Sequence, residues 1–476
     1  MKLYAFLALL CLAACGDDAI HPPPIAELMK PETCKECHAE HYNQWAGSMH
    51  AYAADDPVFV AMNNRGQRDT GDKLGTFCVS CHAPMAVKLG LTDGRNFDPT
   101  TLPPEARGVT CYFCHNVEAV TDTHNNGLTL AMDQTMRGGV RDPVKSPAHF
   151  SKYDELMDSD RNNSEMCGSC HDIVVPQELN GVAGGVAVER TFAEWKQTFF
   201  ATESDPGIHL SCGACHMPGD PNPRVLADAA GLTVPARRNA FHEHAWPAID
   251  QALTPWPGID EQAALIKREL DGAVRVVGPF NVIAQTQPGG ICIEENLLKI
   301  RLDTISPGHA FPSGAAHDRR AWLEVIAKNA AGDVIFSSGV VPEDADPPDD
   351  PFVESNPVSI GLWDRTFKSD GAPAHFFWEI AEVRSHLMKV PTVRGEDHSY
   401  NFKWQLPNLN EIDRVETRLL IRALPFAVLD DLEASGDLDP AVRGQLKLLT
   451  VEGGRSVWTK ATKGMGDAIN TGCNPN

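Results

Sequence analysis

The clearest hydrophobic pattern in the chain is a two-residue alternation in its second half. At residues 400–406, Tyr, Phe, Trp and Leu alternate with polar residues, and residues 298–302 follow the same pattern. A period of two places every second side chain on one face, so both segments are predicted to be half-buried β-strands. Residues 322–328 and 334–336 flank a polar, Gly-containing turn and are predicted to pair as strand, turn and strand. Together these strands predict an antiparallel β-sandwich, such as an immunoglobulin-like one, over residues 273–424.

The segments on either side of this one have other patterns. Residues 32–250 contain short helical fragments, many Gly and Pro residues and few long apolar periods. A linker at 251–272 includes a helical pattern at 261–270. The predicted fold class is therefore multidomain α+β, with a mostly helical or irregular domain before the sandwich and a short helical carboxy terminus. Within the last segment, residues 425–476, two amphipathic helices are predicted, at 426–434 and 440–449.

The first residues have the pattern of a processing segment. Lys2 precedes an apolar run at 3–12, and the sequence Leu-Ala-Ala-Cys at 12–15 is similar to the lipobox of bacterial lipoproteins. That similarity implies cleavage of a signal peptide at 1–14, a lipid on Cys15 and a location in the bacterial cell envelope, periplasmic or at the surface. An ordinary signal peptide or an uncleaved anchor is the alternative, although the run is too short to span a bilayer. Three consecutive Pro residues predict an extended tether at 15–31.

Candidate chemistry lies in the motif Cys-x-x-Cys-His, which occurs five times. At the Cys and His frequencies of this chain, chance would supply about 0.02 copies. Zinc sites pair two Cys-x-x-Cys halves or add a distant His, and a thioredoxin-like motif occurs once in a βαβ unit, so neither fits. The spacing is that of covalent haem attachment, in which two thiols bind the porphyrin and the His binds the iron. The predicted attachment residues are Cys34, Cys37 and His38; Cys78, Cys81 and His82; Cys111, Cys114 and His115; Cys167, Cys170 and His171; and Cys212, Cys215 and His216.

The spacing of the motifs predicts close packing of the haems. Five motifs between residues 34 and 216 leave about 37 residues for each haem. A segment of that size cannot build an ordinary hydrophobic core, so the porphyrins are predicted to form the core of a pentahaem domain at 32–250. Closely packed haems pass electrons to one another, which predicts an electron-transfer protein.

The far ligand of each iron decides between electron transfer and catalysis. The chain has 18 His, and five of them belong to the motifs, which leaves thirteen. Five haems with two His ligands need only five of these, so a wholly six-coordinate set is feasible. His124, which follows the third motif at loop distance, is one candidate, and a solvated loop His is the alternative.

Segments around the motifs also carry a resemblance. They read Cys-Lys-Glu-Cys-His-Ala-Glu-His-Tyr-Asn-Gln-Trp at 34–45, Ser-Met-His at 48–50, Gly-Val-Thr-Cys-Tyr-Phe-Cys-His at 108–115, Ser-Pro-Ala-His at 146–149 and Cys-Gly-Ala-Cys-His-Met-Pro at 212–218. As a set they resemble the cytochrome c554 and hydroxylamine oxidoreductase superfamily, over about half of the chain. The resemblance implies that His50 and His149 each reach a haem other than that of their nearest motif. It also implies that His244 is a distal ligand after the last motif, with His242 as its competitor.

His309 lies in a turn rich in Gly and Pro within the second domain, and two cationic residues, Arg319 and Arg320, follow it closely. One interpretation is a strand-connecting turn with a hydrogen-bonded His. The other is that His309 caps a haem from the second domain, with Arg319 or Arg320 paired to propionates.

Two smaller features leave alternatives open. Cys292 and Cys473 are outside the motifs, and a disulfide is the default expectation outside the cytoplasm. The acidic residues at 342–351 are compatible with a calcium site, but their spacing is not that of an EF-hand, and a solvated loop is the simpler interpretation.

The charge of the chain limits its partners. A formal net charge of -23 excludes a nucleic-acid partner, because the phosphate backbone is itself negative. Redox proteins with basic docking patches are the predicted partners, and the chain is also compatible with a place in a larger redox assembly.

These features predict a lipid-anchored, extracytoplasmic pentahaem c-type cytochrome that transfers electrons between redox partners. The alternative is a multihaem oxidoreductase with one open haem, acting on a small nitrogen or sulfur compound. Two marks of relatives with such activity are absent here: the Cys-x-x-Cys-Lys attachment of pentahaem nitrite reductases and the eight motifs of hydroxylamine oxidoreductase. No catalytic residue is therefore assigned.

Overall fold

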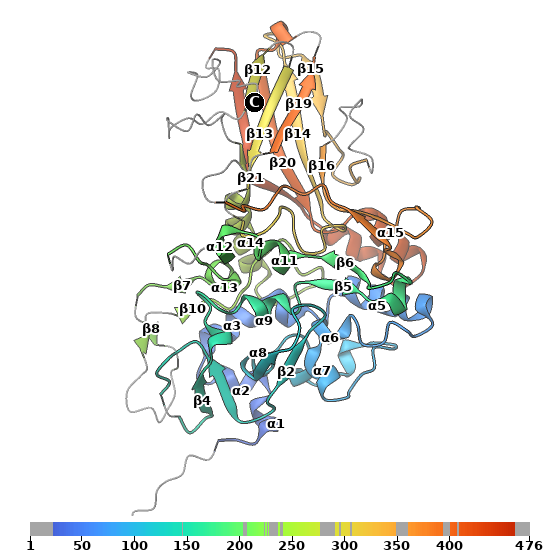
Figure 1. Ribbon diagram of the computed structural model, residues 1–476. Coiled ribbons are helices and arrows are strands. Elements are labelled where there is room, and N and C mark those ends of the chain that lie inside the picture. Colours follow the sequence, from blue (N-terminus) through green and yellow to red (C-terminus); the bar gives the residue numbers. More distant parts are fainter. Residues whose placement is uncertain are drawn as a thin grey trace, which may run out of the picture.

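Figure 1 shows a lower region of short helices and small sheets beneath an upper region of long strands. The computed structural model describes residues 22–144, 146–202, 207–222, 224–225, 227, 237–238, 241–276, 291–294, 297–304, 307–348, 360–393, 400–406 and 409–461. The predicted signal segment, Cys15 and Cys473 lie outside these residues, as does the side chain of Cys292. In this part of the chain, no helix combines the length and apolar character that crossing a membrane requires.

The lower region is built from short helices. Among the described residues of this region, α5 is the longest helix: Asp56 caps its first turn, and Gly71, at φ 59°, ends it in a left-handed conformation. The helices of this region are α1 (Ile25–Leu28), α2 (Pro31–Lys35), α3 (Ala39–Ala46), α4 (Met49–Tyr52), α5 (Pro57–Thr70), α6 (Val79–His82), α7 (Pro84–Lys88), α8 (Cys111–His115), α9 (Ser164–Gly168), α10 (Gln177–Asn180), α11 (Thr191–Trp195), α12 (Phe199–Thr202) and α13 (Cys212–His216).

Small two-stranded sheets lie between these helices. All of those described pair antiparallel except β3 with β4, which is parallel. The pairs are β1 (Val117–Val120) with β2 (Leu128–Leu130), β3 (Thr135–Gly138) with β4 (Phe150–Tyr153), β5 (Ile173–Val175) with β6 (Val186–Glu189), β7 (Gly219–Asp220) with β10 (Phe241–His242), and β8 (Arg224–Val225) with β9 (Arg237–Arg238).

A connecting helix, α14 (Ile259–Ala273), leads into the upper region, where the sequence predicts one. It is followed by a four-stranded antiparallel sheet in which β13 pairs with β11, β12 and β19. Leu298 of β13 lies opposite Trp404, and Leu302 lies opposite Tyr400, so the two alternating segments are neighbouring strands. The strands of this sheet are β11 (Arg275–Val276), β12 (Ile291–Glu294), β13 (Leu297–Asp303) and β19 (Tyr400–Gln405).

A second antiparallel sheet of five strands completes the upper region. The predicted strand, turn and strand segment is its β14 and β15 pair, which confirms that prediction. The strand β20 lies between β14 and β21, and β16 also pairs with β14. The strands are β14 (Arg320–Lys328), β15 (Val334–Ser338), β16 (Ile360–Leu362), β20 (Arg414–Arg422) and β21 (Leu448–Thr459).

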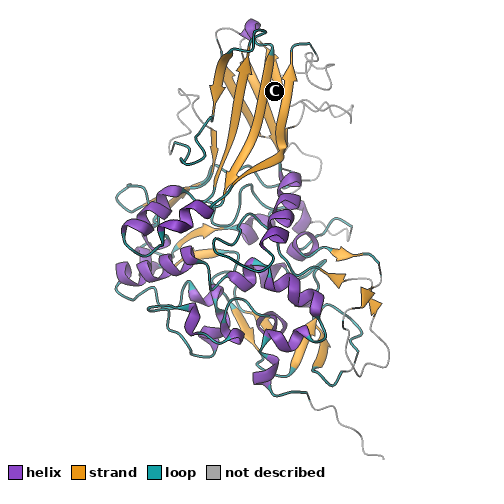
Figure 2. Ribbon diagram, turned by 180° about the vertical axis from the view of Figure 1, so that it is seen from behind, coloured by secondary structure: helices purple, strands orange, loops and turns teal. Residues whose placement is uncertain are grey.

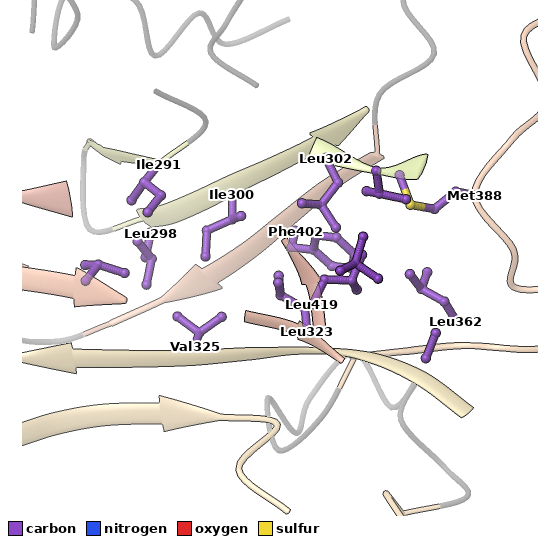
Figure 3. Close-up of a cluster of buried hydrophobic side chains, with 14 of the residues drawn as sticks. Ile291, Leu298, Ile300, Leu302, Leu323, Val325, Leu362, Met388, Phe402 and Leu419 are labelled. Carbon is purple, nitrogen blue, oxygen red and sulfur yellow. The ribbon is translucent and has the colours of Figure 1, made fainter. Parts of the chain in front are cut away.

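The two sheets share one hydrophobic core. Leu298 and Ile300 of the first sheet, and Leu323 and Val325 of the second, are 0% exposed and belong to one cluster of buried side chains. Figure 3 shows these side chains between strands of the two sheets. Alternating residues therefore bury one face of each sheet, as the period of two requires.

The carboxy-terminal segment differs in part from the two helices predicted for it. The helix expected at 426–434 is present as α15 (Phe426–Ala434). The second expected helix, at 440–449, is wrong: Pro440–Gln445 is a 3-10 turn, and the chain then returns to the upper region as β21. Leu448 and Leu449 pair with Arg422 and Ile421, so they supply strand pairing where a helix was expected. The sheet region consequently extends past residue 424 to Thr459.

The two regions are joined by apolar contacts. Val58 of α5, Leu253, Trp378, Phe426 and Leu429 belong to one buried cluster, which packs α15 against the lower region. Figure 2 shows from behind how the helical region supports one end of the sheets. A further two-stranded sheet lies in the connections of this boundary, formed by β17 (Arg365–Phe367) and β18 (Glu382–Arg384).

Candidate haem-binding site

Each Cys-x-x-Cys-His motif forms a single helical turn. In the first motif the amides of Cys37 and His38 both donate to the carbonyl of Cys34, at 3.2 and 2.8 Å. Positions i, i+3 and i+4 lie on one side of a helix, so both thiols and the imidazole of a motif face the same way. One porphyrin can therefore bind all three side chains.

The five motifs lie against one another although they are far apart in sequence. The thiols of Cys34 and Cys111 are hydrogen-bonding partners, so the first motif meets the third. The thiol of Cys170 contacts that of Cys81, so the fourth motif meets the second. The thiol of Cys167 contacts that of Cys212, which joins the fourth motif to the fifth.

The third and fourth motifs are also neighbours. Hydrogen bonding to other thiols and burial raise the pKa of Cys167 and Cys170, and Cys114 of the third motif makes a smaller electrostatic contribution to both. The fourth motif thus borders three others and is the junction of the cluster.

Four of the motif imidazoles face a second imidazole from elsewhere in the chain. Two nitrogens bound to one metal ion from opposite sides are about 4 Å apart, which puts the ring centres slightly more than about 6 Å apart. The observed separations match this arrangement. The four pairs are His38 with His149 (6.3 Å, 27° between rings), His115 with His244 (6.3 Å, 13°), His171 with His50 (6.2 Å, 53°) and His216 with His309 (6.4 Å, 12°).

Backbone carbonyls hold many of these rings in place. Nδ1 of His115 lies 2.6 Å from the carbonyl oxygen of Arg137, and Nδ1 of His309 lies 2.8 Å from that of Ala310. A carbonyl accepts a hydrogen bond from Nδ1–H and leaves the lone pair on Nε2 for a metal. The same contact is made by His82, His149, His216 and His244.

The protonation states also suit metal ligands. Desolvation by the surrounding protein, followed by the charges of neighbouring imidazoles, lowers the pKa of His50 to about 3 and that of His171 to about 4. Both rings are therefore neutral at pH 7, and a neutral imidazole is the form that binds iron. The residues present fit the haem groups that the motifs imply.

The imidazole of His82 has a different neighbour. Its ring is stacked on Phe59, with centres 4.0 Å apart and an angle of 4° between the planes. Among the described residues, no imidazole faces it at the separation seen in the four pairs. The second motif thus has the near ligand of a haem without a facing His.

His124, which was expected as a distal ligand, is not brought into a facing pair. Its Nε2 lies 3.3 Å from the carboxylate of Asp122, and its side chain is 38% exposed. These contacts favour the alternative of a loop His. The competitor His242 also donates from Nδ1 to a carbonyl, that of Met217 at 2.7 Å, but its Nε2 lies 3.8 Å from the carboxylate of Asp160 and its ring belongs to none of the four pairs.

His41 lies near several motif rings without facing an iron position. Its centre is 6.0 Å from that of His38, but it follows in the next helical turn and is stacked on Phe241 at 4.2 Å. Two rings side by side on one helix cannot occupy opposite faces of one porphyrin.

Arg319 has a protein partner in place of the propionate considered for it. Its two terminal nitrogens donate to the carboxylate of Asp250 at 2.6 and 2.7 Å, and one of them also donates to the carbonyl of Ala423. Sequence analysis missed Asp250 and its neighbour Asp56. Asp56 precedes a Pro at the start of a helix, which signals an N-cap and gives no sign of proximity to a haem motif.

Comparison with known proteins gives a family match for part of the chain and a structural match for most of it. Residues 33–116 match the family model described as cytochrome c554 and c-prime. The fold is similar to that of a penta-heme cytochrome c552 from Thermochromatium tepidum, with a TM-score of 0.59, 18% sequence identity, and coverage of 91% of this chain and 99% of that chain. No curated protein matches the chain.

The motifs, the facing imidazoles and these matches define a multihaem c-type cytochrome. The match to the cytochrome c554 family covers residues 33–116, which include the first three motifs, and it lies in a part of the chain where the sequence resembles that superfamily.

Proposed function

We propose that the protein is an extracytoplasmic electron carrier with five covalently attached haems. The observation that carries this proposal is the contiguous cluster of five motifs, four of which place their His opposite a second imidazole. Two strong axial ligands leave an iron no open position, which suits one-electron transfer. When bound, the haems supply that one-electron chemistry.

The protein holds each group through residues from distant segments. Thioethers of ten Cys fix the porphyrins, and five motif His supply the near ligands. The far ligands in this proposal are His149 for the first motif, His244 for the third, His50 for the fourth and His309 for the fifth.

From the contacts between the motifs, we propose a branched path for electrons. The first motif meets the third, the third meets the fourth, and the fourth meets both the second and the fifth. Electrons that enter at the first or fifth motif pass through the fourth, and the second motif is a side branch.

The upper region has a direct part in this proposal. His309 lies in the connection between β13 and β14, so we propose that the two sheets form a β-sandwich that supplies the far ligand of the fifth haem. The haem region is then incomplete without the sheets.

Electron paramagnetic resonance of the oxidised protein tests the ligand set. We expect four low-spin haems and one high-spin haem, the latter on the second motif. His309→Ala is expected to add a second high-spin signal, because it removes one far ligand. His375→Ala is the matched control, since His375 bonds to Asp431 at the surface. An unchanged spectrum for His309→Ala would remove that residue from the ligand set.

A second function is favoured by the surroundings of His82. A haem with one axial imidazole has an open position and can bind a small molecule, which is the oxidoreductase alternative. Carbon monoxide is expected to bind one haem per reduced protein and two in His309→Ala. If carbon monoxide does not bind to the wild-type protein, the oxidoreductase function is excluded and electron transfer is the remaining proposal.

The anchor and the partners in this proposal rest on the sequence. A lipid on Cys15 would hold the protein at the cell envelope, and the net charge of -23 would attract basic docking surfaces of redox proteins. Cys15→Ser is expected to abolish acylation, measured by mass, and to release the protein into the soluble periplasmic fraction. A wild-type protein without the lipid mass would contradict the anchor.

A further inference from the structure

A hollow of about 430 Å³, counting space open to solvent, lies where the two regions meet. Met49 and Asp56 line it from the lower region, together with Asp250. Leu446 and Lys447, which lead into β21, line it from the other side. It therefore gives water a route to two carboxylates between the regions.

Asp56 also lines this hollow, and its carboxylate accepts hydrogen bonds from backbone amides. Its Oδ1 accepts the cap hydrogen bond from the amide of Val58 at 2.9 Å, and the amide of Phe59 also donates to this carboxylate. Burial, and then the negative charge of Asp250, raise the pKa of Asp56 to about 6, against the opposing effect of the cap. Its proton is thus exchangeable near neutral pH.

Asp250 accepts two hydrogen bonds from the guanidinium of Arg319, at 2.6 and 2.7 Å. The other charged or titratable groups around the hollow come from several elements. They are Lys447 at the rim, Tyr52 one turn before Asp56, and Glu189, whose carboxyl is near Arg319. Among these, Asp56 combines access to the hollow with the absence of a cationic hydrogen-bond partner in the described structure.

The hollow adjoins two haem motifs. The carbonyl of Ala53, three residues before Asp56, accepts the Nδ1 hydrogen bond of His82 at 3.0 Å. Met49 directly precedes His50, which faces His171. The charge of Asp250 acts on both His82 and His171 as well as on Asp56. A change of charge at either motif therefore acts electrostatically on the carboxylates of Asp56 and Asp250.

We propose that Asp56 takes up a proton from solvent through this hollow when the haems of the second and fourth motifs are reduced. The inference rests on the proposed function, because it requires haems at those motifs. One electron from a one-electron reductant, a redox protein in the cell, lowers the charge of the iron by one. One O–H bond forms on the carboxylate of Asp56 with a proton from bulk buffer, and reoxidation returns that proton. Electron transfer on this side of the protein is then linked to proton transfer.

Spectroelectrochemical titration between pH 5 and pH 8 tests the proposal, with dithionite as the reductant. Above about pH 6, Asp56 is ionised in the oxidised protein. There the equilibrium constant for haem reduction is expected to change by up to tenfold per pH unit, which is about 59 mV in the midpoint potential. Asp56→Asn keeps the cap acceptor and is expected to flatten this dependence for two haems. Asp98→Asn is the matched control, because Asp98 also caps a turn before a Pro but is exposed.

A second readout is the number of protons bound on reduction in weakly buffered solution. The wild-type protein and Asp98→Asn are expected to bind protons, and Asp56→Asn to bind fewer. Equal pH dependence in Asp56→Asn and the wild type would overturn the proposal, as would pH-independent potentials in the wild type. Loss of the dependence only in Asp250→Asn would move the site to that residue and equally overturn it. Haem content and mass, measured on each variant, separate this failure from a failure of the five attachments themselves.

Discussion

The two regions of this molecule reach stability by different means. The upper region has strands of nine and twelve residues, and its two sheets bury a continuous core that includes Trp404 and Leu323. The lower region places its motifs on helices of four or five residues, which are too short to be stable alone. The comparison indicates that the short motif helices depend for their stability on the groups they bind. The strands depend on burial of their own hydrophobic face.

The largest effect is expected when haem attachment is prevented. The full chain, produced without haem delivery, is expected to lose the fold of the lower region, because the porphyrins are its proposed core. The upper region, from α14 to Thr459, is expected to stay folded, since Ile266 and Leu270 already belong to its core. Limited proteolysis with mass spectrometry measures this difference.

The haem-loaded protein is the control for that experiment, and it is expected to resist proteolysis over both regions. A haem-free chain that remains protected throughout residues 32–250 would show that the lower region does not depend on its cofactors.

A smaller effect is expected from the core of the sheets. Leu323→Ala removes a side chain that is 0% exposed and should lower the free energy of unfolding by about 3–5 kcal/mol. Far-ultraviolet circular dichroism is expected to report this loss, while the haem absorbance changes at a higher temperature. Val334→Ala on β15 is the control, because Val334 is 56% exposed and should cost less than about 0.5 kcal/mol.

If both signals of Leu323→Ala change together at one lowered temperature, the two regions unfold as one unit. The two regions would then differ in how they are built, but they would not differ in stability.

Local patterns predicted the elements well where one face of a strand is buried. The alternation at residues 298–302 and 400–406 predicted β13 and β19 together with their buried residues. It could not predict β21, because Gly453 and Gly454 interrupt the alternation at an irregularity opposite β20. A Cβ on Gly453 would lie 2.0 Å from the carbonyl oxygen of Val274, so the interruption is required by close contact with a segment far away in sequence.

The site was predictable in part for a similar reason. Each motif is local and identifies its own Cys and His, and resemblance indicated His50, His149 and His244. Which motif each of these faces depends on contacts across more than a hundred residues of sequence, so pairing required the structure. Counting His residues also suggested enough far ligands for every haem, yet His82 faces none among the described residues. The number of His residues in the sequence does not determine where each of them lies in the fold.

The smallest effect is expected at Glu189, where the two regions meet. Burial raises the pKa of Glu189 to about 7 against the opposing charge of Arg319, whereas the unfolded chain keeps the ordinary value of 4.5. The folded protein therefore binds more protons than the unfolded chain between these two values, so its stability falls as pH rises from about 4.5 to about 7. Glu189→Gln should remove this fall, which is on the order of 2–3 kcal/mol at about 1.4 kcal/mol per pKa unit. Thermal unfolding followed at pH 5 and pH 8 measures it, with the exposed Glu178→Gln as the control. Equal pH dependence in Glu189→Gln and the wild type would mean that the boundary is more open to water than its contacts imply.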